Sequence, residues 1–255
     1  MIRVLYLLVA GLIISISAKA ADPIWLINFN GEGEGDAPPT LMKTDSSEVS
    51  ASGDFSQTED AELGRMKIVT SDGPDGGMAL EIAPGDIQNG AGYQSSKRGQ
   101  GLEGNELTYE ALIKPIETSE SFKKSWGGQQ IINQQPGGSI PQFWLSYSDN
   151  GSVAFGSTSA KGLVGLVEPG KWSHVAGVVV LSEAVGGDSS MKLYINGDLV
   201  QEASFPRPAG KFPTSLGLGK YLQTSKGDSF QGQIDAIAVT PAALEPSSFA
   251  LPLPK

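Results

Sequence analysis

Residues 171–181 read KWSHVAGVVVL, and this stretch decides the fold. Its second half is almost entirely apolar, which is typical of a strand buried on both faces at the centre of a sheet. Residues 191–195, MKLYI, then alternate, and Asn196-Gly197 separates them from the short strand at 198–200. Asn-Gly between two strands favours a type I′ turn, because both central residues need positive φ. The two segments together predict an antiparallel sheet.

Similar short apolar or alternating stretches occur on both sides of this region, with turns rich in Gly, Pro, Asn and Asp between them. They cover residues 24–29, 78–82, 107–113, 130–133, 142–147, 153–156, 216–219 and 230–239. No segment has a convincing helical pattern. We therefore expect an all-β protein, a sandwich or barrel of roughly a dozen short strands. Residues 43–62 are mostly polar, with Ser, Thr, Asp and Glu predominating, which indicates a surface excursion.

The composition excludes several classes of function. The chain has 255 residues and a formal net charge of −10, which argues against nucleic acid or an anionic membrane as its main partner. It contains no cysteine, so disulfides, thiolate metal sites and Cys nucleophiles are excluded. His174 is the one histidine, so a two-histidine metal motif is excluded as well.

The start of the chain has the pattern of an export signal. Arg3 precedes a nearly continuous apolar stretch from Val4 to Ile16, and Ala18-Lys19-Ala20 fits a small-x-small cleavage site. The apolar stretch is short for a bilayer span, which needs roughly 20 residues. We expect a signal peptide at 1–20 and an exported domain at 21–255, periplasmic or extracellular, with no membrane span in the mature chain.

Three short motifs, in this order, carry a resemblance to a known family. They are Trp-x-His-Val-Ala at 172–176, Leu-Tyr-Ile-Asn-Gly at 193–197 and Phe-x-Gly-x-Ile-Asp at 230–235. With the strands around them they resemble the laminin-G-like, concanavalin A-like jelly-roll domains of bacterial exported proteins. The resemblance covers residues 78–250, and residues 24–31 look like the family's opening strand. It implies two antiparallel sheets packed face to face. Residues 32–75 match nothing in the pattern, and we read them as a polar surface excursion.

Asp235 is a candidate metal ligand. It interrupts an otherwise apolar strand, and a carboxylate buried there needs a partner. Calcium is one such partner, because it binds six to eight oxygen atoms. The resemblance implies a structural calcium between the first and last strands, which would place Asp235 near Asn28 or Asn30. Asn30 stands where many relatives carry Asp. The alternative is an Asp bonded to backbone N–H groups or to Lys or Arg.

Aromatic residues suggest a sugar-stacking platform, since aromatic rings bind the apolar faces of sugars. Trp126 lies in a Gly-rich stretch, and Trp144 alternates with Ser146 on the side of its strand opposite Phe143 and Leu145. Tyr221 completes the set of candidate ligand-binding residues. The alternative for each is a tryptophan or tyrosine that simply packs on a loop.

No catalytic constellation is visible in the sequence. His174 shares a strand face with Ala176 and Val178 and lacks a Gly-x-Ser-x-Gly partner, so we expect a structural histidine. Glu110 lies mid-strand with no acidic neighbour at i±2, and the Glu-x-Asp-x-x-Glu strand motif of related glucanases is absent. We therefore expect a non-catalytic module that binds a glycan or a cell-surface protein. A divergent glycoside hydrolase or lyase, and an envelope component without a small ligand, are the alternatives.

Overall fold

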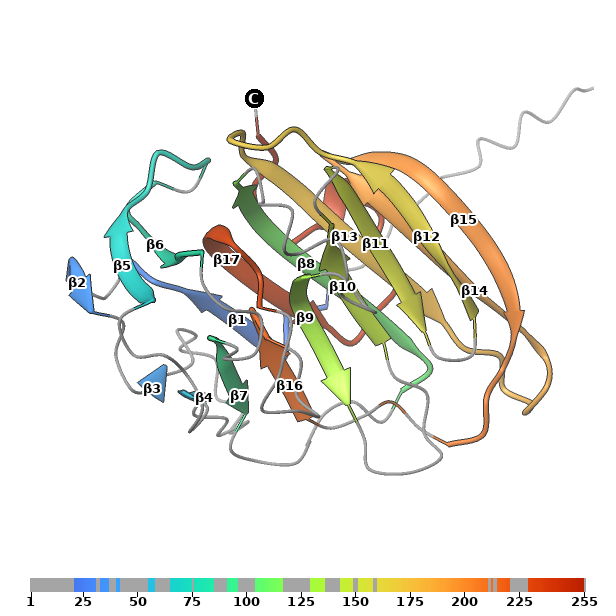
Figure 1. Ribbon diagram of the computed structural model, residues 1–255. Coiled ribbons are helices and arrows are strands. Elements are labelled where there is room, and N and C mark those ends of the chain that lie inside the picture. Colours follow the sequence, from blue (N-terminus) through green and yellow to red (C-terminus); the bar gives the residue numbers. More distant parts are fainter. Residues whose placement is uncertain are drawn as a thin grey trace, which may run out of the picture.

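Figure 1 shows the computed structural model, in which the strands form two antiparallel sheets stacked as two layers. The structure describes residues 21–30, 33–36, 40–41, 55–57, 65–74, 76–84, 91–95, 104–116, 129–135, 143–148, 151–157, 160–210, 212, 215–220 and 229–254. This architecture is a jelly-roll sandwich, and it confirms the all-β, two-sheet prediction.

The larger sheet has nine strands. In spatial order they are β15 (Asp198–Pro206), β14 (Asp188–Ile195), β13 (Ser173–Val180), β8 (Glu106–Pro115), β17 (Gly232–Thr240), β6 (Met78–Ile82), β5 (Met66–Thr70) and β2 (Gly35–Asp36), with β1 (Trp25–Asn28) also paired to β17. The predicted central strand is thus β13, which pairs with β8 on one side and β14 on the other.

The second sheet has eight strands. In spatial order they are β12 (Ala160–Leu166), β11 (Ser152–Ser157), β10 (Phe143–Tyr147), β9 (Gln129–Gln135), β16 (Ser215–Leu218), β7 (Tyr93–Ser95), β4 (Phe55–Gln57) and β3 (Thr40–Leu41). Residues that alternate along the strands of both sheets fill the space between the layers. Tyr109 of β8 packs there against Phe143 of β10 and Phe155 of β11, at ring-centroid distances of 6.5 and 5.8 Å.

The β14–β15 hairpin has the predicted turn. Asn196 and Gly197 have φ of 52° and 85°, as a type I′ turn requires. Gly177 of β13 has a different role, because a Cβ there would lie 2.3 Å from the Phe155 ring. A glycine at the centre of the apolar strand therefore lets the aromatic cluster approach the nine-stranded sheet.

Residues 32–75 contribute to the sandwich rather than only to its surface. β2, β3, β4 and β5 all lie in this region, and Met66 and Ile68 of β5 are buried in the core. β5 pairs with β6 along its length, from Met66 opposite Ile82 to Thr70 opposite Met78. The five-residue alternation is too short to be distinguished from the polar sequence around it, and pairing with β6 stabilises it.

The last residues form a strap, here called the C-terminal strap (residues 241–254), on the outer face of the nine-stranded sheet. Its one turn of 3-10 helix spans Pro246–Ser248. The Phe249 ring packs against His174 at 5.0 Å between ring centroids, and Leu251 joins an apolar cluster with Leu112 and Ala238. The strap explains why β13 is apolar on both faces. Among the described residues, no helix is long and apolar enough to cross a membrane.

Candidate functional site

Trp144 lies on the outer face of the eight-stranded sheet. Its strand neighbours Phe143 and Leu145 are buried between the layers, whereas Trp144 is half-buried on the opposite side. The predicted alternation of β10 is therefore confirmed. The ring lies over β11, because a Cβ on Gly156 would be 3.0 Å from Trp144 Cε2 and Cζ2. Glycine at this position leaves room for the indole.

Amide side chains continue the row on the other side of Trp144. Asn133 of β9 is directly opposite Trp144, and Gln130 is opposite Ser146. A strand that alternated strictly would place residues 130 and 133 on opposite faces. A register shift between Leu145 and Ser146 places both on the outer face, where Asn133 Nδ2 donates a 3.2 Å hydrogen bond to Gln130 Oε1.

The side-chain oxygen of Asn133 accepts no hydrogen bond from the described residues. That side chain is only 1% exposed. A buried carbonyl oxygen left unbonded costs about 1–3 kcal/mol, so this atom requires a donor. Gln130 and Ser146 are buried as well, so the half-buried Trp144 is the member of this group that a ligand reaches, and an indole binds the apolar face of a sugar.

This face carries no acid on its strands. None of the eight strands of this sheet, within the bounds given above, contains Asp or Glu. Hydrolysis of a glycosidic bond by the usual mechanism needs two carboxyl groups on either side of the bond. The strand residues of this face therefore do not supply that pair.

The other two predicted ligand-binding residues, Trp126 and Tyr221, lie outside the described residues. Both predictions stand as made. The pattern at residues 130–133 predicted a strand but did not mark Asn133 and Gln130 as site residues. The signal that would have identified them is the bulge, and a bulge depends on the pairing with β10 rather than on the sequence of β9.

Asp235 is fully buried at an irregular point of β17. The register between β17 and β8 shifts between Ile234 and Ala236, so Asp235 is an extra residue in the strand. A Cβ on Gly73 would lie 2.5 Å from Asp235 Oδ2 and 2.9 Å from Ser71 Oγ. The carboxylate therefore occupies the space that a side chain at Gly73 would fill, beside the loop between β5 and β6.

Asn28 and Asn30 lie at the end of the first strand. Asn28 is opposite Ala236, the residue after Asp235, and its Oδ1 accepts a 3.4 Å hydrogen bond from the backbone N–H of Asn30. Asn30 Oδ1 accepts a 2.9 Å bond from the N–H of Met78, which begins β6 after that same loop. Two of the three predicted ligands thus contact the same loop, Asp235 at its Gly73 end and Asn30 at its Gly77–Met78 end.

These residues fit calcium by chemistry, because all the donors are oxygen atoms and one is a carboxylate. Among the described residues, no group of three or more His, Cys, Asp or Glu side chains gathers at one point. A calcium ion at Asp235 would therefore rely on amide and backbone carbonyl oxygens for most of its ligands. Calcium binding here remains a prediction.

His174 and Glu110 form an enclosed pair between the sheet and the C-terminal strap. His174 Nε2 lies 3.1 Å from Glu110 Oε2, and both side chains are fully buried. Glu110 also accepts the backbone N–H groups of Ala250 and Leu251, each at 3.1 Å. The pair holds the strap in place.

Comparison with known proteins gives one family. The family model of the concanavalin A-like lectin/glucanase superfamily, laminin G type, matches residues 88–249, which is more than half of the chain. The match includes all three motifs at 172–176, 193–197 and 230–235. No curated protein sequence matches this chain significantly.

Solved structures with the same fold include proteins that bind or act on glycans. Domain 4 of AbnA, an extracellular GH43 arabinanase of Geobacillus stearothermophilus solved with arabinotriose, is 18% identical with a TM-score of 0.53, over 90% of this chain and 97% of that one. The alginate lyase Aly36B, as a mutant with alginate tetrasaccharide, is 16% identical with a TM-score of 0.50, over 89% and 99%. The receptor-binding domain of botulinum neurotoxin type G is 9% identical with a TM-score of 0.55, and this chain spans half of it. At these identities the likeness shows the fold alone.

Proposed function

The chain belongs to the concanavalin A-like lectin/glucanase superfamily, and from that premise we propose that it is a non-catalytic module that binds a glycan. The fold hosts both binding domains and enzymes, so the choice rests on the site. The observation that carries the proposal is the outer face of the eight-stranded sheet. A half-buried indole lies there beside two buried amides and a buried hydroxyl, and the strands contain no Asp or Glu.

The proposed binding mode follows from the positions of these groups. A sugar ring stacks its C–H face on the Trp144 indole, which lies across Gly156. Asn133 and Gln130 of β9 are buried beside the indole, so the exposed part of Trp144 is the proposed contact surface. Trp126 and Tyr221 are further proposed contacts from the sequence.

The alternatives make different predictions. A hydrolase or lyase would release products from a polysaccharide, whereas an adhesion or envelope component would bind a protein without binding sugar. The likeness to an alginate lyase keeps the enzyme alternative open, since a lyase does not need paired carboxylates. We also propose export of the protein, from residues 1–20. Intact-mass measurement of exported material should give a chain that starts at Ala21, and a retained leader would refute that part of the proposal.

The test is glycan-array binding together with a product-release assay on the same purified protein. We expect binding to at least one glycan, no product release, and a loss of about tenfold or more in affinity for Trp144→Ala, because stacking on the ring is removed. Trp25→Phe is not a suitable control, because Trp25 is buried in the core. Leu166→Ala, on the exposed surface of β12, is the matched control and should bind normally. Product release, or equal binding by Trp144→Ala, would contradict the proposal.

A further inference from the structure

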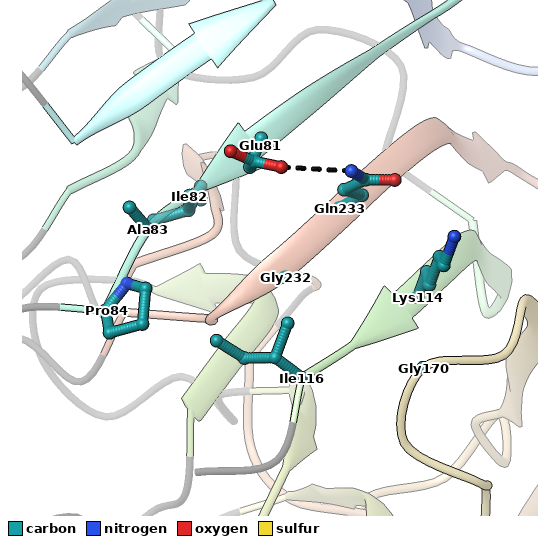
Figure 2. Close-up of a pocket in the computed structure, with 9 residues that line it drawn as sticks. All are labelled: Glu81, Ile82, Ala83, Pro84, Lys114, Ile116, Gly170, Gly232 and Gln233. Atoms are coloured by element: carbon teal, nitrogen blue, oxygen red, sulfur yellow. Dashed lines mark hydrogen bonds between the residues drawn. The ribbon is translucent and has the colours of Figure 1, made fainter. Parts of the chain in front are cut away.

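A cleft lies on the outer face of the nine-stranded sheet, at the ends of β6, β8 and β17. Its inner part is a cavity of about 250 Å³ with an apolar side made by Pro84 and Ile116. Figure 2 shows the side chains of Glu81 and Gln233 next to each other at the opposite end, with Lys114 beside them. We call this the Lys114 cleft, lined by Glu81, Pro84, Lys114, Ile116, Gly170 and Gln233.

The polar side of the cleft is a row set by strand pairing. Glu81 of β6 is opposite Gln233 of β17, which in turn is opposite Lys114 of β8. Gln233 Nε2 donates a 3.0 Å hydrogen bond to Glu81 Oε2. Carboxylate, amide and ammonium groups thus lie side by side on a rigid sheet, and together they offer hydrogen-bond acceptors and donors to a ligand.

A second hollow of about 530 Å³, with a more polar lining, adjoins the first and shares Lys114 and Gly170 with it. Asp72, Trp172 and the end of the C-terminal strap, residues 252–254, line this outer part. Asp72 accepts hydrogen bonds from Lys114 Nζ at 2.9 Å and from Trp172 Nε1 at 2.7 Å. The outer hollow therefore extends the cleft past the ammonium group, and a chain of more than one ring can continue there.

The charges of the cleft indicate which ligands fit. The hydrogen bonds from Lys114 and Trp172 lower the pKa of Asp72, so this carboxylate stays ionised next to the Lys114 ammonium group. Glu81 adds a second carboxylate on the other side. A ligand anion would therefore meet two carboxylates and an ammonium group that is already paired, so the cleft disfavours acidic sugars.

Glycine gives the cleft its shape. A Cβ on Gly232, whose φ is +135°, would lie 2.3 Å from the carbonyl oxygen of Lys114. β17 therefore begins in direct backbone contact with β8, and side chains are kept off the floor of the cavity. The cavity is somewhat smaller than the roughly 300–1,000 Å³ of drug-sized sites, so its inner part suits a single ring.

We propose that the Lys114 cleft is a second binding site, for one unit of an uncharged saccharide. The ring's apolar face packs on Pro84 and Ile116, and its hydroxyls bond to Glu81, Gln233 and Lys114. This site goes beyond the proposed function. It lies on the outer face of the nine-stranded sheet, whereas Trp144 lies on the eight-stranded sheet, and it uses none of the contacts of Trp144. Two such sites on one domain would let it bind two chains of one polymer.

The test uses the full mature protein and isothermal titration with cellotriose, xylotriose, maltotriose and arabinotriose, with trigalacturonate as the acidic probe. Trp144→Ala is the background, so that any binding by the other face is removed. We expect at least one neutral trisaccharide to bind this variant saturably and trigalacturonate to bind it less tightly. Adding Gln233→Ala should weaken the neutral binding about 3- to 10-fold, as loss of one hydrogen bond predicts.

Two further variants serve as a cavity-filling test and as a control away from the cleft. Ala83→Phe fills the inner cavity and should abolish the binding without removing a polar contact. Gln201→Ala removes an exposed amide on β15 that accepts the N–H of Val164 and lies far from the cleft in the strand order, so it should leave the affinity unchanged. Thermal melting of each variant shows that it is folded.

The outcomes separate the two proposals. If the Trp144→Ala background binds none of the neutral sugars, or if Gln233→Ala and Ala83→Phe bind as that background does, the Lys114 cleft is not a sugar site, whatever the wild-type protein binds. If the wild-type protein loses its binding only through Gln233→Ala and not through Trp144→Ala, the cleft is supported and the face around Trp144 is refuted.

Discussion

The contacts of Glu110 predict how strongly the C-terminal strap is held. One carboxylate oxygen accepts the N–H of Ala250, and the other accepts the N–H of Leu251 and faces His174 Nε2. Glu110→Gln keeps the shape but replaces one oxygen with an NH₂ group. In the more favourable orientation of the amide, its oxygen still accepts the N–H of Leu251 and still faces His174 Nε2. The NH₂ group then points at the N–H of Ala250, so two hydrogen-bond donors face each other.

The expected cost follows from these contacts. A buried donor without an acceptor costs about 1–3 kcal/mol, and the remaining bonds lose the strength that the charge gives them. We therefore expect Glu110→Gln to lower the free energy of unfolding by about 2–4 kcal/mol. At roughly 2–4 °C per kcal/mol for a domain of this size, the melting temperature should fall by roughly 5–15 °C.

Two measurements check this prediction. Urea denaturation gives the free energy of unfolding, and hydrogen exchange reports on the amides of Ala250 and Leu251, which should lose protection. Glu106→Gln is the matched control. Glu106 lies in the same strand and accepts the N–H of Ala243 at 3.2 Å, but it is exposed, so its loss should cost well under 1 kcal/mol. If the two variants have equal stability and the exchange of Ala250 is unchanged, Glu110 does not anchor the strap.

Two further predictions concern ions. If calcium binds at Asp235, a hundredfold excess of calcium over Kd stabilises the folded protein by about 2.7 kcal/mol, so a chelator should lower the wild-type melting temperature by roughly 5–10 °C. The melting temperature of Asp235→Asn should not respond to calcium. An unchanged wild-type melting temperature on chelation would refute the calcium site. The pKa of Asp72 is lowered by its bonds to Lys114 and Trp172, so their stabilisation is present above the ordinary carboxyl pKa and is lost as the pH falls through the lower folded value. A low-pH change in tryptophan fluorescence that is present in wild type and absent in Asp72→Asn would support this, and identical titrations would contradict it.

The sequence predicted the features that depend on local physics. Alternation in β10 placed Trp144 opposite Phe143 and Leu145, and Asn196-Gly197 adopts the positive φ values that its hairpin needs. Both depend on residues that are neighbours in the chain, so the sequence records them directly. The family also follows from three short motifs in order.

Parts of the molecule that depend on pairing were decided by the tertiary structure. β5 is stable because β6 lies beside it, and its five residues within a polar region give no such indication. Gln130 and Asn133 share a face because pairing with β10 introduces a bulge. Glu81, Gln233 and Lys114 come from three strands far apart in the sequence, and only the order of strands in the sheet makes them neighbours.

The same division holds for the role of His174. The sequence alone determined that it lies on a mostly apolar face of a central strand and has no nucleophile nearby in the chain. The tertiary structure decided what covers it, because the strap returns from the end of the chain to place Phe249 on its ring, while β8 places Glu110 beside it. Periodicity reports which face of a strand is buried, but which segment buries it depends on contacts between residues that are distant in the sequence.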